Sequence, residues 1–301
     1  MIEIRIPAST GNLGSGFDVF GLAVRLYLKV RVGLRKDKKT VITFSGEGSN
    51  SISRKQNLVY STIKTFLRSK NADAPGFTLD IRNSIPVKRG LGSSGTARLA
   101  GIIAADYLGK LELTKKEILS EAIRLEGPPD NINSSYVGGL TASLILENGI
   151  TEYRKYPFPG DLTLVFAVPE FTLTTAAGRK VLPEKYPLKD TIYNLQRVSL
   201  FFEAVRGRDY ELLSHLLQDR LHQDYRAGLI PGLKEILSLS PGDGLIGTCL
   251  SGSGPTACAL ADDNHEEIGN TMVSLFQSRG IAAGCLIVKA DNRGTIIRRM
   301  E

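Results

Sequence analysis

The sequence predicts an α+β fold of two lobes, and three observations lead to this prediction. Strand-like and helix-like segments are mixed in both halves, a second set begins near residue 150, and no repeat or low-complexity linker lies between them. A chain of 301 residues is also long enough to bury one large core or two smaller ones. We expect lobes at residues 1–150 and 151–301, with a ligand cleft between them.

Strands of the first lobe are predicted from apolar stretches, several of which alternate with polar residues as in a half-buried sheet. The predicted strands are 2–8, 26–34, 39–48, 76–87 and 138–146. A charged break between the second and third of these strands predicts a hairpin.

Helices of the first lobe are predicted from apolar residues at helical spacing and from end signals. They are 57–70, 95–109 and 114–127. Asn57 stands at the N-cap of the first helix, and Thr114 with Glu117 forms a capping box on the third, which ends at Gly127.

The second lobe is predicted to begin with a strand and to continue through a largely helical region. The expected elements are a strand at 161–169, helices within 188–222, a strand–glycine turn–strand unit at 244–262, a helix at 265–280 and a strand at 282–290.

Composition argues against several classes of protein. The net charge of +7 comes from scattered basic residues, whereas a nucleic-acid site needs them clustered. The three cysteines have neither zinc-site spacing nor a disulfide pattern, so we expect free, buried thiols in a reducing compartment. No apolar run reaches the roughly 18–20 residues of a membrane span. Charges at Glu3 and Arg5 interrupt any signal-peptide core. We expect a cytoplasmic protein.

Three glycine-rich segments carry the functional signal: 7–21, 86–101 and 251–256. The second, PVKRGLGSSGTARLAG, lacks both the P-loop and the Rossmann pattern. Its glycines would let the backbone approach a ligand, and the N-terminus of the helix that follows favours an anion such as phosphate. A structural turn is the alternative. Three such segments, each with polar side chains, indicate loops that converge on one ligand.

The three segments resemble the motifs of the GHMP kinases. PVKRGLGSSGTA is similar to the ATP loop of that family, and SGSGPT to its third motif. PASTGNLGSGFDVFGLA, EGPPDN, RKVLP and LHQDYRAGLIPG resemble motifs of the homoserine kinases within it. The six motifs occur in the order of the family, which makes the agreement highly specific.

The resemblance implies an N-terminal lobe like domain 2 of ribosomal protein S5 and a ferredoxin-like C-terminal lobe. It also implies transfer of the γ-phosphate of ATP to the side-chain hydroxyl of L-homoserine, in threonine biosynthesis, with Mg²⁺ as cofactor and a homodimer as the assembly. Phosphoryl transfer depends mainly on positioning and charge neutralisation, so most of the implied residues hold the reactants.

The implied ATP site lies around the second glycine segment. Its residues are Asn57, Lys88, Arg89, Gly90, Leu91, Gly92, Ser93, Ser94 and Gly95. Asn57 falls at the position of the adenine pocket, although a plain helix cap explains it equally well. Lys88 and Arg89 could equally be solvated. Ser94 is expected to approach the metal.

The implied amino-acid site needs groups of both charge signs. Arg179 and Arg226 match arginines that bind the substrate carboxylate, and forked hydrogen bonds suit that role. Asp18 would face the ammonium group, and Asn12 would help to orient the substrate. Asn131 would orient the hydroxyl, not remove its proton. The expected catalytic residues are Asn131, Ser94 and Arg179; surface ion pairs are the alternative for the arginines.

Three positions depart from the family pattern or stay ambiguous. Pro128 stands where the motif has histidine, which puts substrate choice in doubt. The family glutamate that binds magnesium, counted back from the Asp-Asn pair, falls on Ser120, so Glu121 is the predicted ligand only if the helix register shifts. His222 could orient a neighbour or simply be packed in the core.

Three alternative functions remain open at this stage. A GHMP kinase for another small alcohol or amino acid is suggested by Pro128. A catalytically weak relative that binds ATP or a metabolite is suggested by the uncertain magnesium glutamate. A nucleic-acid-binding protein is suggested by the pI of about 9.2 and by the implied S5-like lobe, but no recognition motif supports it.

Overall fold

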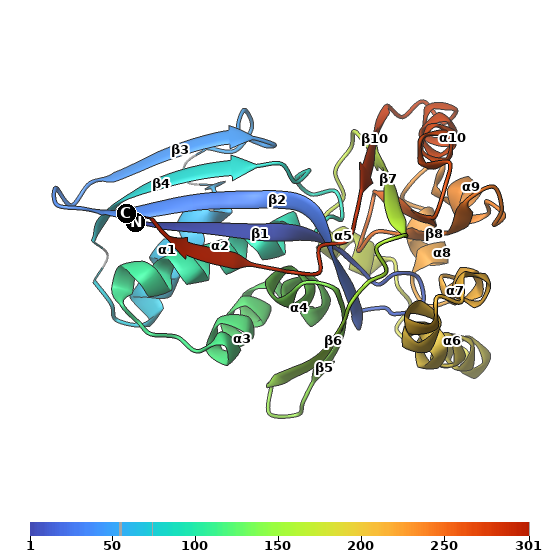
Figure 1. Cartoon of the computed structure of the whole chain (residues 1–301), viewed down its shortest axis with the longest axis horizontal. Helices are drawn as coiled ribbons and strands as arrows, with labels where there is room; N and C mark the ends of the chain where they lie inside the picture. Colours follow the sequence, from blue (N-terminus) through green and yellow to red (C-terminus); the bar gives the residue numbers. More distant parts are fainter. Residues whose placement is uncertain (54–55, 74, 301) are drawn as a thin grey trace.

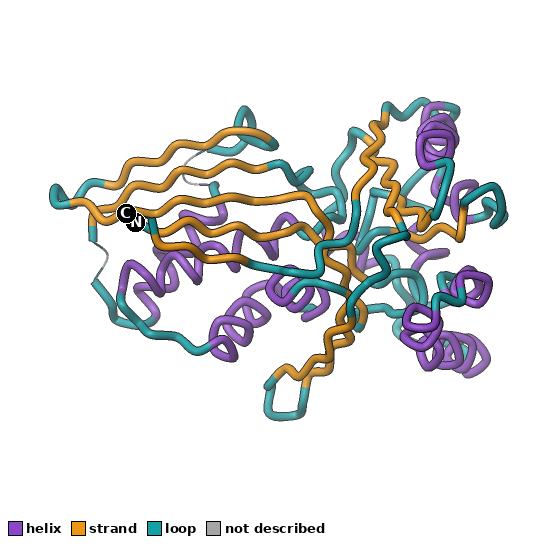
Figure 2. Tube along the Cα trace, viewed as in Figure 1, coloured by secondary structure: helices purple, strands orange, loops and turns teal. Residues whose placement is uncertain are grey.

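The computed structural model describes residues 1–53, 56–73 and 75–300, which form two sheets with helices packed on each (Figures 1 and 2). The first sheet has seven strands, of which five follow the order β11-β1-β2-β4-β3, while β5 pairs with β2 and β6. The strands are β1 (Ile2–Gly11), β2 (Phe20–Arg35), β3 (Thr40–Gly46), β4 (Gly76–Asn83), β5 (Leu140–Ile145), β6 (Thr151–Tyr156) and β11 (Ile296–Arg299).

Four helices cover one side of this sheet (Figure 1). They are α1 (Leu58–Ser69), α2 (Ser93–Gly109), α3 (Lys115–Glu126) and α4 (Pro129–Val137). The predicted caps are confirmed: the Asn57 side chain accepts a hydrogen bond from Tyr60 N, and Thr114 and Glu117 form a capping box. Helix α4 was not predicted, because its polar sequence PDNINSSYV has no apolar stripe.

The second sheet has four antiparallel strands in the order β10-β7-β9-β8. These are β7 (Thr163–Pro169), β8 (Leu245–Leu250), β9 (Ala257–Ala261) and β10 (Ala283–Val288). The helices of this lobe are α5 (Thr175–Lys180), α6 (Leu188–Gly207), α7 (Tyr210–Leu216), α8 (Gln223–Ala227), α9 (Leu233–Leu237) and α10 (His265–Gln277). The predicted ferredoxin-like lobe is confirmed, since a strand order of fourth, first, third, second defines that fold.

The predicted hairpin in the first lobe is wrong. Strand β3 pairs only with β4, in parallel, because the chain crosses over through α1 before β4 takes its place between β2 and β3. The charged break therefore marks the end of β2 at the sheet margin and not a tight turn.

Two strands of the first sheet lie beyond residue 150, where the sequence analysis placed the boundary between the lobes. Strand β6 extends the first sheet to Tyr156, and β11 returns to that sheet and pairs with β1. Both strands are short, of six and four residues, and neither gives a clear strand pattern in the sequence. The first lobe thus comprises roughly the chain up to β6 together with β11, and Figure 1 shows the two termini side by side.

The structure shows the state of the three cysteines and the lengths of the helices, on which the sequence analysis made predictions. Cys249 and Cys258 are buried and free, whereas Cys285 is free but exposed, on the edge strand β10. Across the residues that the structure describes, no helix has the length and apolar content that a membrane span requires.

Candidate active site

The three glycine-rich segments meet between the lobes, as the sequence predicted. Gly252 N donates to Gly11 O at 3.1 Å, which joins the first and third segments. Ser251 Oγ lies 2.7 Å from Gly90 O and 2.9 Å from Thr10 Oγ1, so it contacts both of the others. A Cβ on Gly90 would overlap Ser251 O, and only glycine permits this approach.

A cavity of about 790 Å³ opens beside this junction. Its inner wall includes Gly90, Gly92, Ser93 and Ser94 from the second segment, and Gly252 from the third. Gly92 has φ +68° and gives α2 no side-chain cap, so the first N–H groups of this 17-residue helix are left for a ligand. These free donors and the helix dipole form a cradle suited to phosphate.

Part of the cavity lining is apolar, which suits a purine base. Phe44, Ile81 and Val87 contribute to it, and Asn57 also lines the cavity. Asn57 Oδ1 caps α1, as the sequence predicted, and the residue also lines the cavity.

The predicted ATP residues do not all face the cavity. Lys88 and Arg89 line it. Leu91 is 1% exposed and packs in the core, and its carbonyl accepts from Ser9 N. Gly95 is buried and faces Ile132. Leu91 and Gly95 therefore support the loop and offer no side chain to a nucleotide.

The carboxylate beside Ser94 belongs to Glu126 and not to Glu121. Ser94 Oγ donates to Glu126 Oε2 at 2.8 Å, and Glu126 lines the cavity. Glu121 does not line it; its oxygens pair with Lys70 at 2.7 Å and Arg124 at 2.8 Å. Glu121 lies five positions before Glu126, and at 100° per residue it points to a different face of α3. The Glu121 prediction is corrected accordingly.

Glu126 has a second partner that the sequence did not suggest. Arg98 Nε donates to Glu126 Oε2 at 2.7 Å, while Glu126 Oε1 has no hydrogen-bond partner within the described ranges. Those residues also hold no cluster of three His, Cys, Asp or Glu side chains that could bind a metal ion. One carboxylate and one hydroxyl fit Mg²⁺, which is usually held by few protein oxygens together with substrate phosphates.

Asn131 lines the cavity where the glycine segments meet. Its Oδ1 accepts from Ser9 Oγ at 2.9 Å, and Ser135 Oγ donates in turn to Ser9 Oγ at 3.1 Å. This chain fixes the orientation of the amide, so the Asn131 Nδ2 group is directed away from Ser9, near Gly11. An amide N–H can orient a hydroxyl but cannot take up its proton.

Asp18 and Arg179 form an ion pair next to these residues. Arg179 Nη2 lies 2.7 Å and 2.8 Å from the two carboxylate oxygens, and both side chains are partly exposed. Asn12 supports this arrangement, because its Oδ1 accepts from Asp18 N at 3.0 Å and its Nδ2 donates to Gly252 O at 2.8 Å. Asn12 therefore joins two loops and positions Asp18.

Arg226 is 2% exposed, which is unusual for a charged side chain. Its Nη1 donates to Gly252 O at 3.1 Å, the same carbonyl that Asn12 binds, and its Nε donates to Gly178 O at 3.1 Å. Burial lowers the pKa of Arg226 and Asp18 raises it. Arg226 thus lies close enough to both members of the Asp18–Arg179 pair to interact with them electrostatically.

Asp130 is a buried carboxyl group that the sequence analysis did not single out. It is 2% exposed, and its Oδ1 has no hydrogen-bond partner in the described part of the chain. Burial, together with the negative charge of Asp18, raises the pKa of Asp130 from 3.8 to about 7. Its neighbour in sequence is Asn131, so a proton held here lies beside the candidate site.

This pKa predicts a pH-dependent stability. Between about pH 4 and 7 the folded chain keeps a proton on Asp130 that the unfolded chain releases. The free energy of unfolding therefore includes a contribution from this proton that is complete below pH 3.8 and is lost as pH rises through 7. The Asp130→Asn variant has no carboxyl group to titrate at this position, so its stability lacks this pH dependence. Relative to wild type, its melting temperature should rise by about 4 °C or more between pH 5.5 and 8.5. A difference that stays constant with pH would contradict the assignment.

Comparison with known proteins decides the family. A model of the GHMP kinase N-terminal domain matches residues 57–139, and one of the GHMP kinase C-terminal domain matches residues 201–276. The homoserine kinase of Aquifex aeolicus is 40% identical over 98% of both chains. The chain belongs to the homoserine kinase family. The Schizosaccharomyces pombe member is 32% identical over 98% of both chains, so the family spans bacteria and yeast.

The fold of the homoserine kinase family is also found in solved structures. The homoserine kinase of Cytophaga hutchinsonii superposes with a TM-score of 0.84 at 24% identity, covering 99% of this chain and 97% of that one. The mevalonate kinase of L. major, solved with R-mevalonate, gives a TM-score of 0.69 at 17% identity and covers 96% of each chain. Both likenesses establish the two-lobed GHMP fold, and the family membership makes the protein a kinase.

Proposed function

We propose that the protein transfers the γ-phosphate of ATP to the side-chain hydroxyl of L-homoserine. The observation that carries the proposal is the pairing of Asp18 with Arg179 beside the buried Arg226, next to a cavity that ends in free helix N–H groups. A substrate with both an ammonium and a carboxylate group matches this arrangement of charges.

On the nucleotide side, the apolar residues of the cavity lining would contact adenine, and the N-terminus of α2 would hold the phosphates. Ser94 and Glu126 would hold a Mg²⁺ ion, whose chemistry there is to neutralise phosphate charge. Arg98 keeps the Glu126 carboxylate in place.

On the acceptor side, Arg179 would exchange its contact with Asp18 for the substrate carboxylate, and Asp18 would take the ammonium group. Each charge would then meet an opposite one, so the exchange leaves neither side chain unpaired. Arg226 would give a second, less mobile contact to the carboxylate. Asn131, oriented by Ser9, would align the hydroxyl with the phosphate.

The substrate is tested by a coupled ADP-release assay across L-homoserine, L-threonine, L-serine and mevalonate. We expect kcat/KM to be highest for L-homoserine, because mevalonate lacks the ammonium group and the other two amino acids carry the hydroxyl one carbon nearer. Equal or greater turnover of another compound would identify a different small-alcohol kinase, the alternative that Pro128 suggested. Absence of turnover with all four would favour a binding protein.

Two further expectations stay predictions. A cytoplasmic location is supported by the three free thiols. A homodimer rests on the family resemblance alone.

A further inference from the structure

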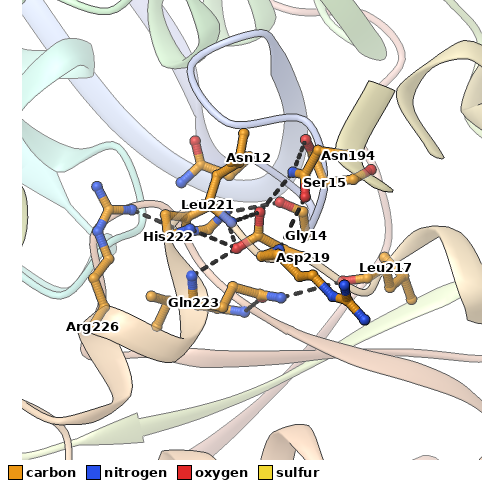
Figure 3. A network of polar contacts seen from close by, with 12 residues as sticks. Asn12, Gly14, Ser15, Asn194, Leu217, Asp219, Leu221, His222, Gln223 and Arg226 are labelled. Carbon is orange, nitrogen blue, oxygen red and sulfur yellow. Dashed lines mark hydrogen bonds and ion pairs between the residues drawn. The ribbon is translucent and has the colours of Figure 1, made fainter. Parts of the chain in front are cut away.

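Beneath the acceptor-side residues, a chain of buried polar contacts links the two lobes through His222 (Figure 3). His222 is fully buried. Its Nε2 lies 2.8 Å from the carbonyl oxygen of Gly14 in the first glycine segment, and its Nδ1 lies 3.2 Å from Arg226 Nη1. One imidazole therefore contacts both the loop that carries Asp18 and the guanidinium proposed to bind the substrate.

The two partners determine where the ring carries its proton. A carbonyl oxygen only accepts, so Nε2 must donate to Gly14, and a guanidinium only donates, so Nδ1 must accept from Arg226. Only the neutral Nε2–H form meets both conditions. Burial lowers the pKa of His222; among the charged groups that face it, Asp219 and Asp18 raise it while Arg226 lowers it.

Arg226 is held on several sides by these contacts. Besides His222, it donates to Gly252 O and Gly178 O, and its guanidinium lies 5.1 Å from the centre of the Phe17 ring. Phe17 also stacks on His222, with ring centres 5.0 Å apart. Nη2 has no hydrogen-bond partner among the residues that the structure describes, so this end of the fork stays available to a ligand.

The segment before α8 that carries His222 is itself anchored. The Asp219 carboxylate accepts from the backbone N–H groups of Leu221, His222 and Gln223, at 3.0, 2.7 and 2.7 Å. Asn194 of α6 donates to Asp219 at 2.7 Å and to Ser15 O at 3.1 Å. With four accepted hydrogen bonds, Asp219 fixes the backbone of His222, so the imidazole cannot turn away cheaply.

We propose that His222, in its neutral Nε2–H form, is a positioning residue that holds the Arg226 guanidinium in register with the Asp18 loop. The role rests on the proposed function, because Arg226 is taken to bind the substrate carboxylate. His222 does not touch the substrate. It orders the guanidinium before binding, so that less conformational freedom is lost when the carboxylate arrives.

Two substitutions separate the two contacts of the ring. In His222→Gln the side-chain amide reaches the place of Nε2 and can donate to Gly14 O, but nothing accepts from Arg226. In His222→Asn an amide oxygen takes the place of Nδ1 and can accept from Arg226, but the contact with Gly14 is lost. We expect His222→Gln to raise the homoserine KM about tenfold with ATP KM within twofold of wild type. His222→Asn should leave the homoserine KM within about threefold but lower the melting temperature.

The exposed His215 provides a matched control, and His215→Gln should change none of these values. The proposal is overturned if His222→Gln leaves the homoserine KM unchanged, or if the KM values of both substrates rise together. It is equally overturned if His222→Asn raises the homoserine KM as much as His222→Gln, since the acceptor would then not matter.

A spectroscopic measurement tests the ring independently of activity. The chain has three histidines, so ¹⁵N-histidine NMR spectra of wild type and His222→Gln assign His222 by difference. We expect the shifts of a neutral Nε2–H ring at pH 6, and a charged imidazolium at that pH would overturn the proposal. If wild type fails to phosphorylate homoserine while this tautomer is found, the proposed substrate is wrong and the contact with Arg226 stands.

Discussion

The Glu126→Gln variant is expected to lose roughly 100-fold or more in kcat. The amide keeps the size of the side chain and can still accept from Ser94 and Arg98, so the fold should survive. It lacks the negative charge that the free Oε1 would offer to Mg²⁺. The Mg²⁺ concentration for half-maximal activity should therefore rise by about 10–100-fold. Initial rates in a Mg²⁺ titration at saturating ATP give both values.

Glu121→Gln is the matched control, because it makes the same change on the same helix. Glu121 is 19% exposed at its side chain and Glu126 is 18% exposed, so exposure does not distinguish them. The two glutamates differ in their partners, because Glu121 pairs with Lys70 and Arg124 outside the cavity. The control should keep wild-type kcat and Mg²⁺ dependence. If Glu121→Gln loses activity and Glu126→Gln does not, Glu121 is the magnesium ligand, as the sequence analysis proposed for a shifted helix register.

Gly92→Val should abolish ATP binding, with a loss in affinity of more than about 100-fold. Gly92 has φ +68°, where a β-branched residue is strongly disfavoured. A Cβ would also overlap Ser9 Oγ and lie 3.2 Å from the Ser9 N and O atoms. The substitution thus strains the loop that forms the phosphate cradle and displaces the hydroxyl that orients Asn131. Equilibrium binding of ATP measures the first effect.

Gly92→Ala adds a single methyl group and covers the case in which the valine variant fails to fold. It should weaken ATP binding by about tenfold. Gly160→Ala is the control, because a Cβ there meets no atom within 4 Å. If Gly92→Ala is folded and binds ATP as wild type does, the glycine serves only the turn and the cradle is elsewhere.

The sequence predicted the meeting of the three glycine segments but not the partner of Ser94. Where two backbones approach closely the sequence must have glycine, so the requirement is visible in the sequence, as at Gly90 and Gly92. The contact between Ser94 and Glu126 spans 32 positions and depends on how the start of α2 packs beside the end of α3. Counting residues along one helix could not show that packing; the count fell on Ser120, and its neighbour Glu121 was taken in place of Glu126.

The missed elements have a related cause. Strand β6, TEYRKY, is polar on both faces, and helix α4 is polar for most of its length, so neither carries a hydrophobic period. Burial of Asn133 and Ser134 in α4 is offset by local hydrogen bonds to Ser143 and to the Asp130 carbonyl. Those partners are known only when the fold is known. Ser9 and Arg98 were missed in the same way, since each acts through a neighbour.

The pairing of β11 with β1 affects the order in which the protein can be assembled during synthesis. Residues Ile2–Arg5 pair with Ile296–Arg299, so β1 receives this neighbour only after β2–β10 have been synthesised. Until then β1 presents an open edge that can pair with other chains. Strand β1 leads directly to Asn12 and the Asp18 loop. In a nascent chain that lacks β11, this loop would therefore be attached to a strand with one neighbour missing.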